Sequence, residues 1–190
     1  IPPGPPARPL QVQFRVSTAP AGTFVLRLDA IVRHRRPAAP RYEVAVFGTS
    51  AAGIDGSTVW REYAFKAKPG DLHRRPSQIA PYHLRLDWLM WFCGFTPWYR
   101  EPWLANFMAK LLQNDPRTLS LIAENPFPGK PPRFVRALLY EYRFTTPEEH
   151  RRTGNWWVRE LRNEYFPIVS LDDPDFRALL EREGWLPGPR

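Results

Sequence analysis

Proline occupies 23 of the 190 positions and is the feature that most limits how this chain can fold. It lacks a backbone N–H and fixes φ near about −65°, so it is excluded from helix interiors and central strands but favoured at helix starts. The segments 1–9 (IPPGPPARP) and 125–132 (NPFPGKPP) are therefore expected to be irregular. We interpret 1–9 as an extended tether and 10–190 as a single domain. Because the chain begins inside this tether without a methionine, we expect it to be part of a longer protein.

Other prolines mark the starts of helices. Three pairs place an N-cap residue directly before a proline: Asp115-Pro116, Thr146-Pro147 and Asp173-Pro174. The segment 146–149 (TPEE) also has the form of a capping box. Residues 104–112 carry apolar side chains at helical spacing. The segment 84–95 is apolar nearly all round, which favours a short buried helix with Trp88 and Trp91 in the core.

Strand patterns lie on both sides of these helices. Residues 11–33 predict two strands around a turn at 19–22, and extended segments are predicted at 42–48, 59–66, 134–144 and 156–169. Strands at both ends with consecutive helices between them indicate an α+β protein. We predict mainly an antiparallel β-sandwich, jelly-roll-like, with a helical insertion at about 84–124.

The charge of the chain is +8, and its excess lies mostly in residues 1–70, which carry ten basic and four acidic side chains. Since no run of Lys or Arg exceeds two residues, a solvated Arg-rich loop explains this charge better than nucleic-acid binding. Cys93 is alone, so the chain cannot form an internal disulfide or a cysteine-based zinc site. The four histidines are scattered without ligand spacing, and we predict no metal and no cofactor.

His83, Arg85 and Asp87 alternate within PYHLRLDW and are the nearest approach to a catalytic set. An enzyme would use His83 as a base oriented by Asp87. His83 and Asp87, four residues apart, meet only on a helix, whereas Arg85 and Asp87, two residues apart, share a face only on a strand. No single helix or strand therefore brings all three side chains together. No hydrolase, metalloprotease or phosphate-binding motif is present. We therefore predict a buried structural pair of Arg85 and Asp87, and no catalytic site.

Aromatic residues are abundant, with 8 Trp, 12 Phe and 7 Tyr. A core accounts for most of them. Trp98, Tyr99, Arg100 and Trp103 lie beside prolines in a predicted loop, and exposed Trp, Tyr and Arg are typical of protein-binding surfaces. These four residues are the predicted binding surface.

Three long motifs carry a resemblance to a known family. They read W-x-x-Y-x-F-K-x-K-P-G-D from residue 60, P-Y-H-x-R-L-D-W-x-M-W-F from residue 81 and N-P-F-x-x-x-P-P from residue 125. Together with NWWVRELRNEYFPIVSL at 155–171, they resemble the C-terminal domain of the lipase maturation factor family over about 41–171. Animal members have cysteines at the positions of Ala67 and Ser77, so the resemblance implies no local disulfide here.

The resemblance implies a soluble domain of a multi-pass membrane protein that assists the folding and assembly of secreted lipases without catalysis. Its expected partners are a secreted lipase client and the N-terminal transmembrane region of the same chain. The domain would face the lumen of the endoplasmic reticulum, or be membrane-associated in a bacterium. A second likeness, of residues 42–65 to the hairpin of discoidin-type jelly-roll modules, implies the alternative function of a sugar- or lipid-binding module.

Overall fold

The structure, a computed structural model, describes residues 17–18, 24–25, 41–77 and 82–186. The chain divides into two compact units, residues 1–38 and 39–190. In the first unit, β1 (Ser17–Thr18) pairs antiparallel with β2 (Phe24–Val25), which agrees with the hairpin predicted around 19–22. The predicted tether 1–9 and the predicted domain start at residue 10 lie outside the described residues.

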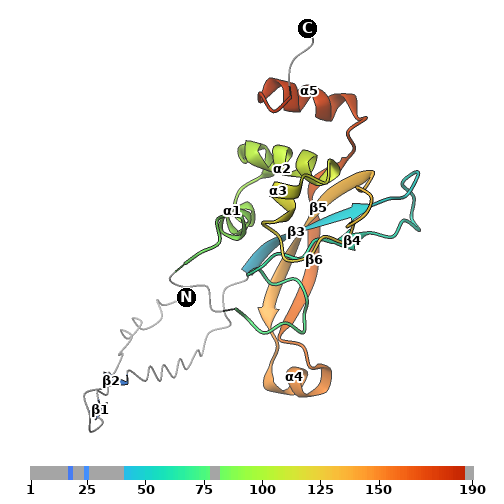
Figure 1. Ribbon diagram of the computed structural model, residues 1–190. Coiled ribbons are helices and arrows are strands. Elements are labelled where there is room, and N and C mark those ends of the chain that lie inside the picture. The colour runs from blue at the N-terminus through green and yellow to red at the C-terminus, as the bar shows by residue number, and fades with distance from the viewer. Residues whose placement is uncertain (1–16, 19–23, 26–40, 78–81, 187–190) are drawn as a thin grey trace, which may run out of the picture. The chain divides into compact units, whose positions relative to one another are not determined.

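The second unit is built on one antiparallel sheet of strand order β4-β3-β5-β6 (Figure 1). Its strands are β3 (Arg41–Thr49), β4 (Arg61–Glu62), β5 (Phe134–Phe144) and β6 (Trp157–Val169). β3 lies in register along β5, with Val46 opposite Ala137 and Phe47 opposite Arg136. Alternate side chains of each strand face opposite sides of the sheet, which gives it two distinct faces.

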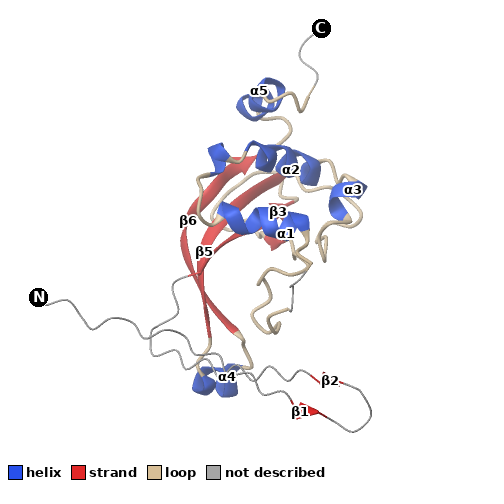
Figure 2. Cartoon of the chain, turned by 90° about the vertical axis from the view of Figure 1, so that its left-hand side faces the viewer, coloured by secondary structure: helices blue, strands red, loops and turns tan. Residues whose placement is uncertain are grey.

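Helices cover one face of this sheet (Figure 2). They are α1 (Arg85–Cys93), α2 (Pro102–Leu112) and α3 (Pro116–Leu119), with a 3₁₀ turn η1 (Trp98–Arg100) between α1 and α2. After the sheet, α5 (Pro174–Arg182) lies beyond the end of the strands, next to α2. The main core joins Val44 and Val46 of β3 to Met90 of α1, Met108 of α2 and Leu180 of α5. The helical insertion predicted at 84–124 is confirmed by its position between β4 and β5.

The predicted capping signals are also confirmed. Asp115 accepts the backbone N–H of Thr118, and Asp173 accepts those of the first turn of α5. α4 (Pro147–Thr153), which joins β5 to β6, starts with the capping box of Thr146 and Glu149 and ends at Gly154 in the left-handed conformation. These signals were readable from the sequence because a cap is made by residues within one turn of each other.

The sandwich prediction needs correction. The opposite face of the sheet carries a second, smaller cluster of Ala45, Phe47 and Leu138, on which Trp60 and Tyr140 pack. Within the described residues of the second unit, 41–77 and 82–186, every named strand belongs to this one sheet, so they contain no second sheet to complete a sandwich. The predicted strand 59–66 joins the ladder only at Arg61–Glu62, because Ala64 instead bridges to Glu124 beside the insertion. The fold is α+β, with one antiparallel sheet covered by helices.

Candidate functional site

Asp87 is buried, as predicted, but Arg85 is not its partner. The carboxylate Oδ1 accepts the backbone N–H groups of Ala67 at 2.7 Å and Lys68 at 3.1 Å. Arg85 is exposed on the first turn of α1, and the two side chains form no ion pair within 4.0 Å. The predicted pair is therefore wrong, because residues two apart on a helix point about 200° apart and only one of them can face the interior.

A buried ion pair lies directly beyond this contact. The Lys68 ammonium pairs with the Glu43 carboxylate of β3, and both side chains are buried. Arg41 donates from Nε to the other Glu43 oxygen at 2.6 Å. A buried charge is tolerated only when it is paired and hydrogen-bonded. The loop 66–70 thus connects α1 to β3 and holds the orientation of the helix.

This orientation decides which side of α1 meets solvent. Leu86, Met90 and Cys93 face the core, at helical spacing. The opposite side carries a row that we call the α1 stripe, formed by Leu84, Trp88, Trp91, Phe92 and Phe95. Trp88 is 40% exposed and Phe95 is 60% exposed, while Trp91 is half-buried. The prediction that Trp88 and Trp91 lie in the core is therefore wrong.

Neighbouring aromatic rings of the α1 stripe are in contact with one another. Trp88 lies 5.2 Å from Phe92 between ring centroids, Trp91 lies 5.5 Å from Phe92, and Trp91 lies 5.3 Å from Phe95. His83 extends the row, with its ring 4.9 Å from that of Trp88. These side chains form a continuous apolar surface, which is unusual on a protein exterior and marks interaction sites.

The four residues predicted as the binding surface divide into two pairs. Tyr99 (68% exposed) and Arg100 are on the surface of η1, four and five residues beyond Phe95, the last residue of the α1 stripe. Trp98 packs edge-on against Phe166 of β6 at 4.9 Å, and the indole of Trp103 donates to Glu101 at 2.7 Å. Both tryptophans are half-buried against the core, so they support the loop and expose little surface.

The α1 stripe was missed because the sequence of α1 is apolar on every side, and such a helix is usually buried. One signal could have found it. The core-facing positions carry aliphatic or sulfur side chains, whereas the positions between them carry Trp and Phe. The acidic residue of the helix, Asp87, lies on the core side, where it accepts hydrogen bonds from a distant loop.

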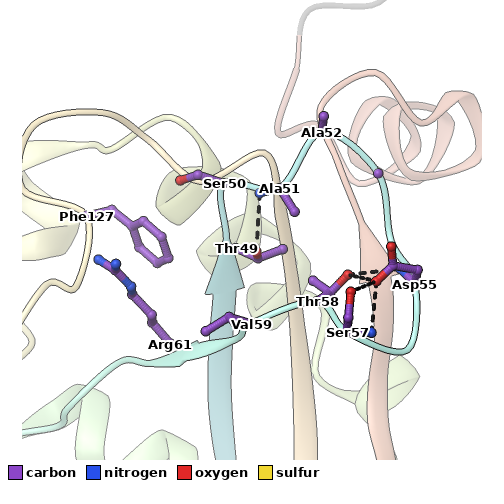
Figure 3. A pocket seen from close by; sticks show the side chains of 11 residues that line it. Thr49, Ser50, Ala51, Ala52, Asp55, Ser57, Thr58, Val59, Arg61 and Phe127 are labelled. Carbon is purple, nitrogen blue, oxygen red and sulfur yellow. Dashed lines mark hydrogen bonds between the residues drawn. The ribbon is translucent and has the colours of Figure 1, made fainter.

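A pocket of about 580 Å³ lies at the end of the sheet, between the β3–β4 loop and Phe127 (Figure 3). Arg61 lies alongside Phe127 at one end, and Asp55 lies with Ser57 and Thr58 at the other (Figure 3). The Asp55 carboxylate already accepts from the Ser57 backbone N–H at 2.9 Å and hydroxyl at 2.7 Å, which lowers its pKa. The pocket offers hydroxyls, one guanidinium and an apolar wall.

The described residues bring no catalytic set together. His83 contacts Trp88, while the Asp87 carboxylate is directed at the loop backbone, so the two do not form an acid–base pair. Burial raises the pKa of the Cys93 thiol to about 11, which leaves it protonated at neutral pH. Among the residues described, no three His, Cys, Asp or Glu side chains gather at a spacing that would hold a metal ion.

Comparison with known proteins now identifies the family. Residues 31–167 match the model of the lipase maturation factor C-terminal domain. The chain belongs to the lipase maturation factor family. It is 45% identical over 153 residues to human lipase maturation factor 1, and 40% identical over 129 residues to human lipase maturation factor 2. A Xenopus laevis lipase maturation factor 2 is 35% identical over 152 residues.

Relatives in the lipase maturation factor family are much longer than this chain. The match covers 78% of the chain but 27% of human lipase maturation factor 1, and 66% of the chain but 18% of human lipase maturation factor 2. No solved structure matches the chain. Within the described part of this family member, every helix is too short or too polar to cross a bilayer.

Proposed function

We propose that this chain is the client-binding, non-catalytic C-terminal domain of a multi-pass membrane protein that assists the folding and assembly of secreted lipases. Family membership and the names of the relatives support the role in lipase maturation. The additional length of those relatives leaves room for a membrane region. By the same resemblance, the domain lies on the lumenal side of the endoplasmic reticulum membrane, or is membrane-associated if its source is bacterial.

The observation that carries the proposal is the α1 stripe. A folding factor binds apolar surface that its client has not yet buried, and this requires apolar surface of its own. Trp and Tyr supply large contact areas at low conformational cost, and Arg adds hydrogen-bond donors, so these three residue types dominate interface hot spots. Tyr99 and Arg100 extend the α1 stripe toward α2 and belong to the same proposed surface.

The test uses cells deficient in lipase maturation that express the full-length protein carrying this chain, with secreted lipase activity as readout. Trp88→Ala with Phe92→Ala is expected to lower secreted activity at least several-fold, because each buried hot-spot aromatic contributes roughly 2 kcal/mol or more. The matched control is Leu121→Ala with Leu161→Ala, which removes exposed apolar side chains outside both the α1 stripe and the pocket beside Phe127. Circular dichroism of both double variants establishes that they remain folded.

Two results would contradict the proposal. One is full rescue by the α1 stripe variant, and the other is a turnover activity of the chain that depends on His83. Trp98→Ala and Trp103→Ala are less informative, because both indoles pack on the core and their loss destabilises the domain. Tyr99→Ala with Arg100→Ala tests the extension of the surface without that complication.

The alternative function, a sugar- or lipid-binding module, rests on the pocket beside Phe127. Its volume and its mixture of hydroxyls with an apolar wall suit a small polyol. Titration with mono- and disaccharides distinguishes the two functions. Saturable binding that Arg61→Ala removes, together with unchanged lipase secretion by the α1 stripe variant, would favour the alternative.

A further inference from the structure

The α1 stripe has the spacing of a helix-packing surface. Leu84, Trp88, Trp91 and Phe95 follow one another at intervals of four, three and four residues. This is the spacing by which one helix presents a single row of side chains to another helix. α1 itself has nine residues, so the row matches about two to three turns of a partner helix.

Within residues 82–100, which carry the α1 stripe, the exposed charges have one sign. Between residues 82 and 100 the basic side chains are Arg85 and Arg100, both exposed, and His83 is also exposed. The only acidic residue in this segment is Asp87, which is buried and accepts hydrogen bonds from the loop backbone. Beyond the segment, Glu101 accepts from Thr96 at 2.9 Å and from Trp103 at 2.7 Å. Within residues 82–100 the apolar row is therefore flanked by exposed basic side chains, and the half-buried Glu101 carboxylate, held by these hydrogen bonds, follows directly after Arg100.

We propose that the α1 stripe binds a short amphipathic helix of the client, with an apolar face of two to three turns and acidic residues beside that face. The inference rests on the proposed client-binding function and adds the chemistry of the segment that is bound. The apolar face of the ligand covers Trp88, Phe92 and Phe95. The carboxylates of the ligand lie near Arg85, at one end of the α1 stripe, and near Arg100, beyond its other end. These charge pairs determine which of the client's apolar segments binds.

A helix ligand fits these observations better than a lipid surface. Helices that lie on membranes present an apolar face to lipid and a polar face rich in Lys and Arg to water. The face of α1 opposite the stripe is not polar and solvated but is packed into the core through Leu86, Met90 and Cys93. The two arginines are separated along the chain rather than arranged in a row. Basic side chains near the two ends of the α1 stripe favour a ligand helix whose carboxylates are spaced to reach both of them.

The experiment measures binding of fluorescent peptides of about five helical turns to the 190-residue chain. The first peptide carries Leu at four–three spacing with Glu beside the Leu face. The second is identical but has Lys in place of Glu, and the third has the Glu peptide's composition in scrambled order. We expect the Glu peptide to bind at least about tenfold more tightly than either of the others.

Variants of the chain assign the binding to the α1 stripe. Trp88→Ala with Phe92→Ala is expected to lower the affinity of the chain for the Glu peptide at least about tenfold. Phe95→Ala, which lies outside the helix and is the most exposed ring of the row, is a second variant that does not disturb α1. Arg85→Glu with Arg100→Glu is expected to reverse the preference toward the Lys peptide.

Three outcomes would overturn the inference. The first is equal affinity for the Glu and Lys peptides, and the second is peptide binding that persists in both aromatic variants. The third is binding to phosphatidylserine-containing vesicles that depends on Trp88 and is not displaced by the Glu peptide. Failure here is distinguishable from failure of the proposed function, because loss of lipase secretion in the α1 stripe variant would still establish client binding.

Discussion

The carboxylate of Asp87 accepts the backbone N–H of Ala67 across 2.7 Å, and this contact joins two motifs that lie twenty residues apart in the sequence. Ala67 belongs to the K-x-K-P-G-D segment, and Asp87 to the segment that forms α1. The next residue, Lys68, extends the connection to Glu43 of β3. The helix that carries the α1 stripe is thus held at one side by a loop and at another by the sheet.

Asp87→Ala is expected to lower the free energy of unfolding by about 3 kcal/mol, because two backbone N–H groups lose a charged acceptor in a buried place. Urea denaturation followed by circular dichroism measures this change. The control is Arg85→Ala, which is expected to change stability by less than about 1 kcal/mol because the side chain is exposed. A loss of similar size in the two variants would restore the ion-pair interpretation rejected above.

Gly94→Ala is expected to destabilise the domain by about 1–3 kcal/mol through overpacking. A Cβ at Gly94 would lie 2.5 Å from the carbonyl oxygen of Tyr42, a backbone atom of β3 that cannot move aside without shifting the strand. Gly53→Ala is the matched control, since a Cβ there meets nothing within 4 Å. Equal thermal unfolding midpoints for the two variants would show that α1 does not approach β3 this closely.

Glu149 gives the capping box of α4 a defined pH dependence. The Arg143 guanidinium, which donates twice at 2.7 and 2.8 Å, and the Thr146 backbone N–H lower the pKa of Glu149 from 4.5 to about 2. Because the folded-state pKa is below the unfolded one, the stabilising contribution is complete above pH 4.5 and is lost as the pH falls toward 2. The thermal unfolding midpoint should therefore decline more steeply over this range in the parent chain than in Glu149→Gln. Parallel curves would contradict the assignment.

Cys93 is expected to resist alkylation in the folded protein at neutral pH, because the thiol is buried and its pKa is raised to about 11. Mass spectrometry after iodoacetamide treatment should show little modification of the native chain and complete modification in urea. Ser77→Cys supplies an exposed thiol as the positive control, and it should react readily in the same sample. Rapid labelling of native Cys93 would show that the core side of α1 opens.

Elements whose signals are local could be predicted from the order of residues alone. Helix starts at Asp115, Thr146 and Asp173 were readable because a cap satisfies the N–H groups of its own first turn. The strand 134–144 was readable because alternation of side chains is a property of a single strand, and the strand 42–48 because it is a run of apolar and β-branched residues. Of the four predicted binding residues only Tyr99 and Arg100 are exposed, since composition near prolines indicates a loop but not which indole turns inward.

Which side of α1 is covered depends instead on contacts with residues far away in the chain. Because the hydrophobic effect is non-directional, the sequence of a helix that is apolar all round does not indicate which side is buried. That choice is made by residues distant in the sequence: Tyr42, whose carbonyl lies against Gly94, and Ala67 and Lys68, whose N–H groups draw Asp87 inward. With Asp87 turned to the core, Trp88, Phe92 and Phe95 are left on the outside, where a second molecule can reach them.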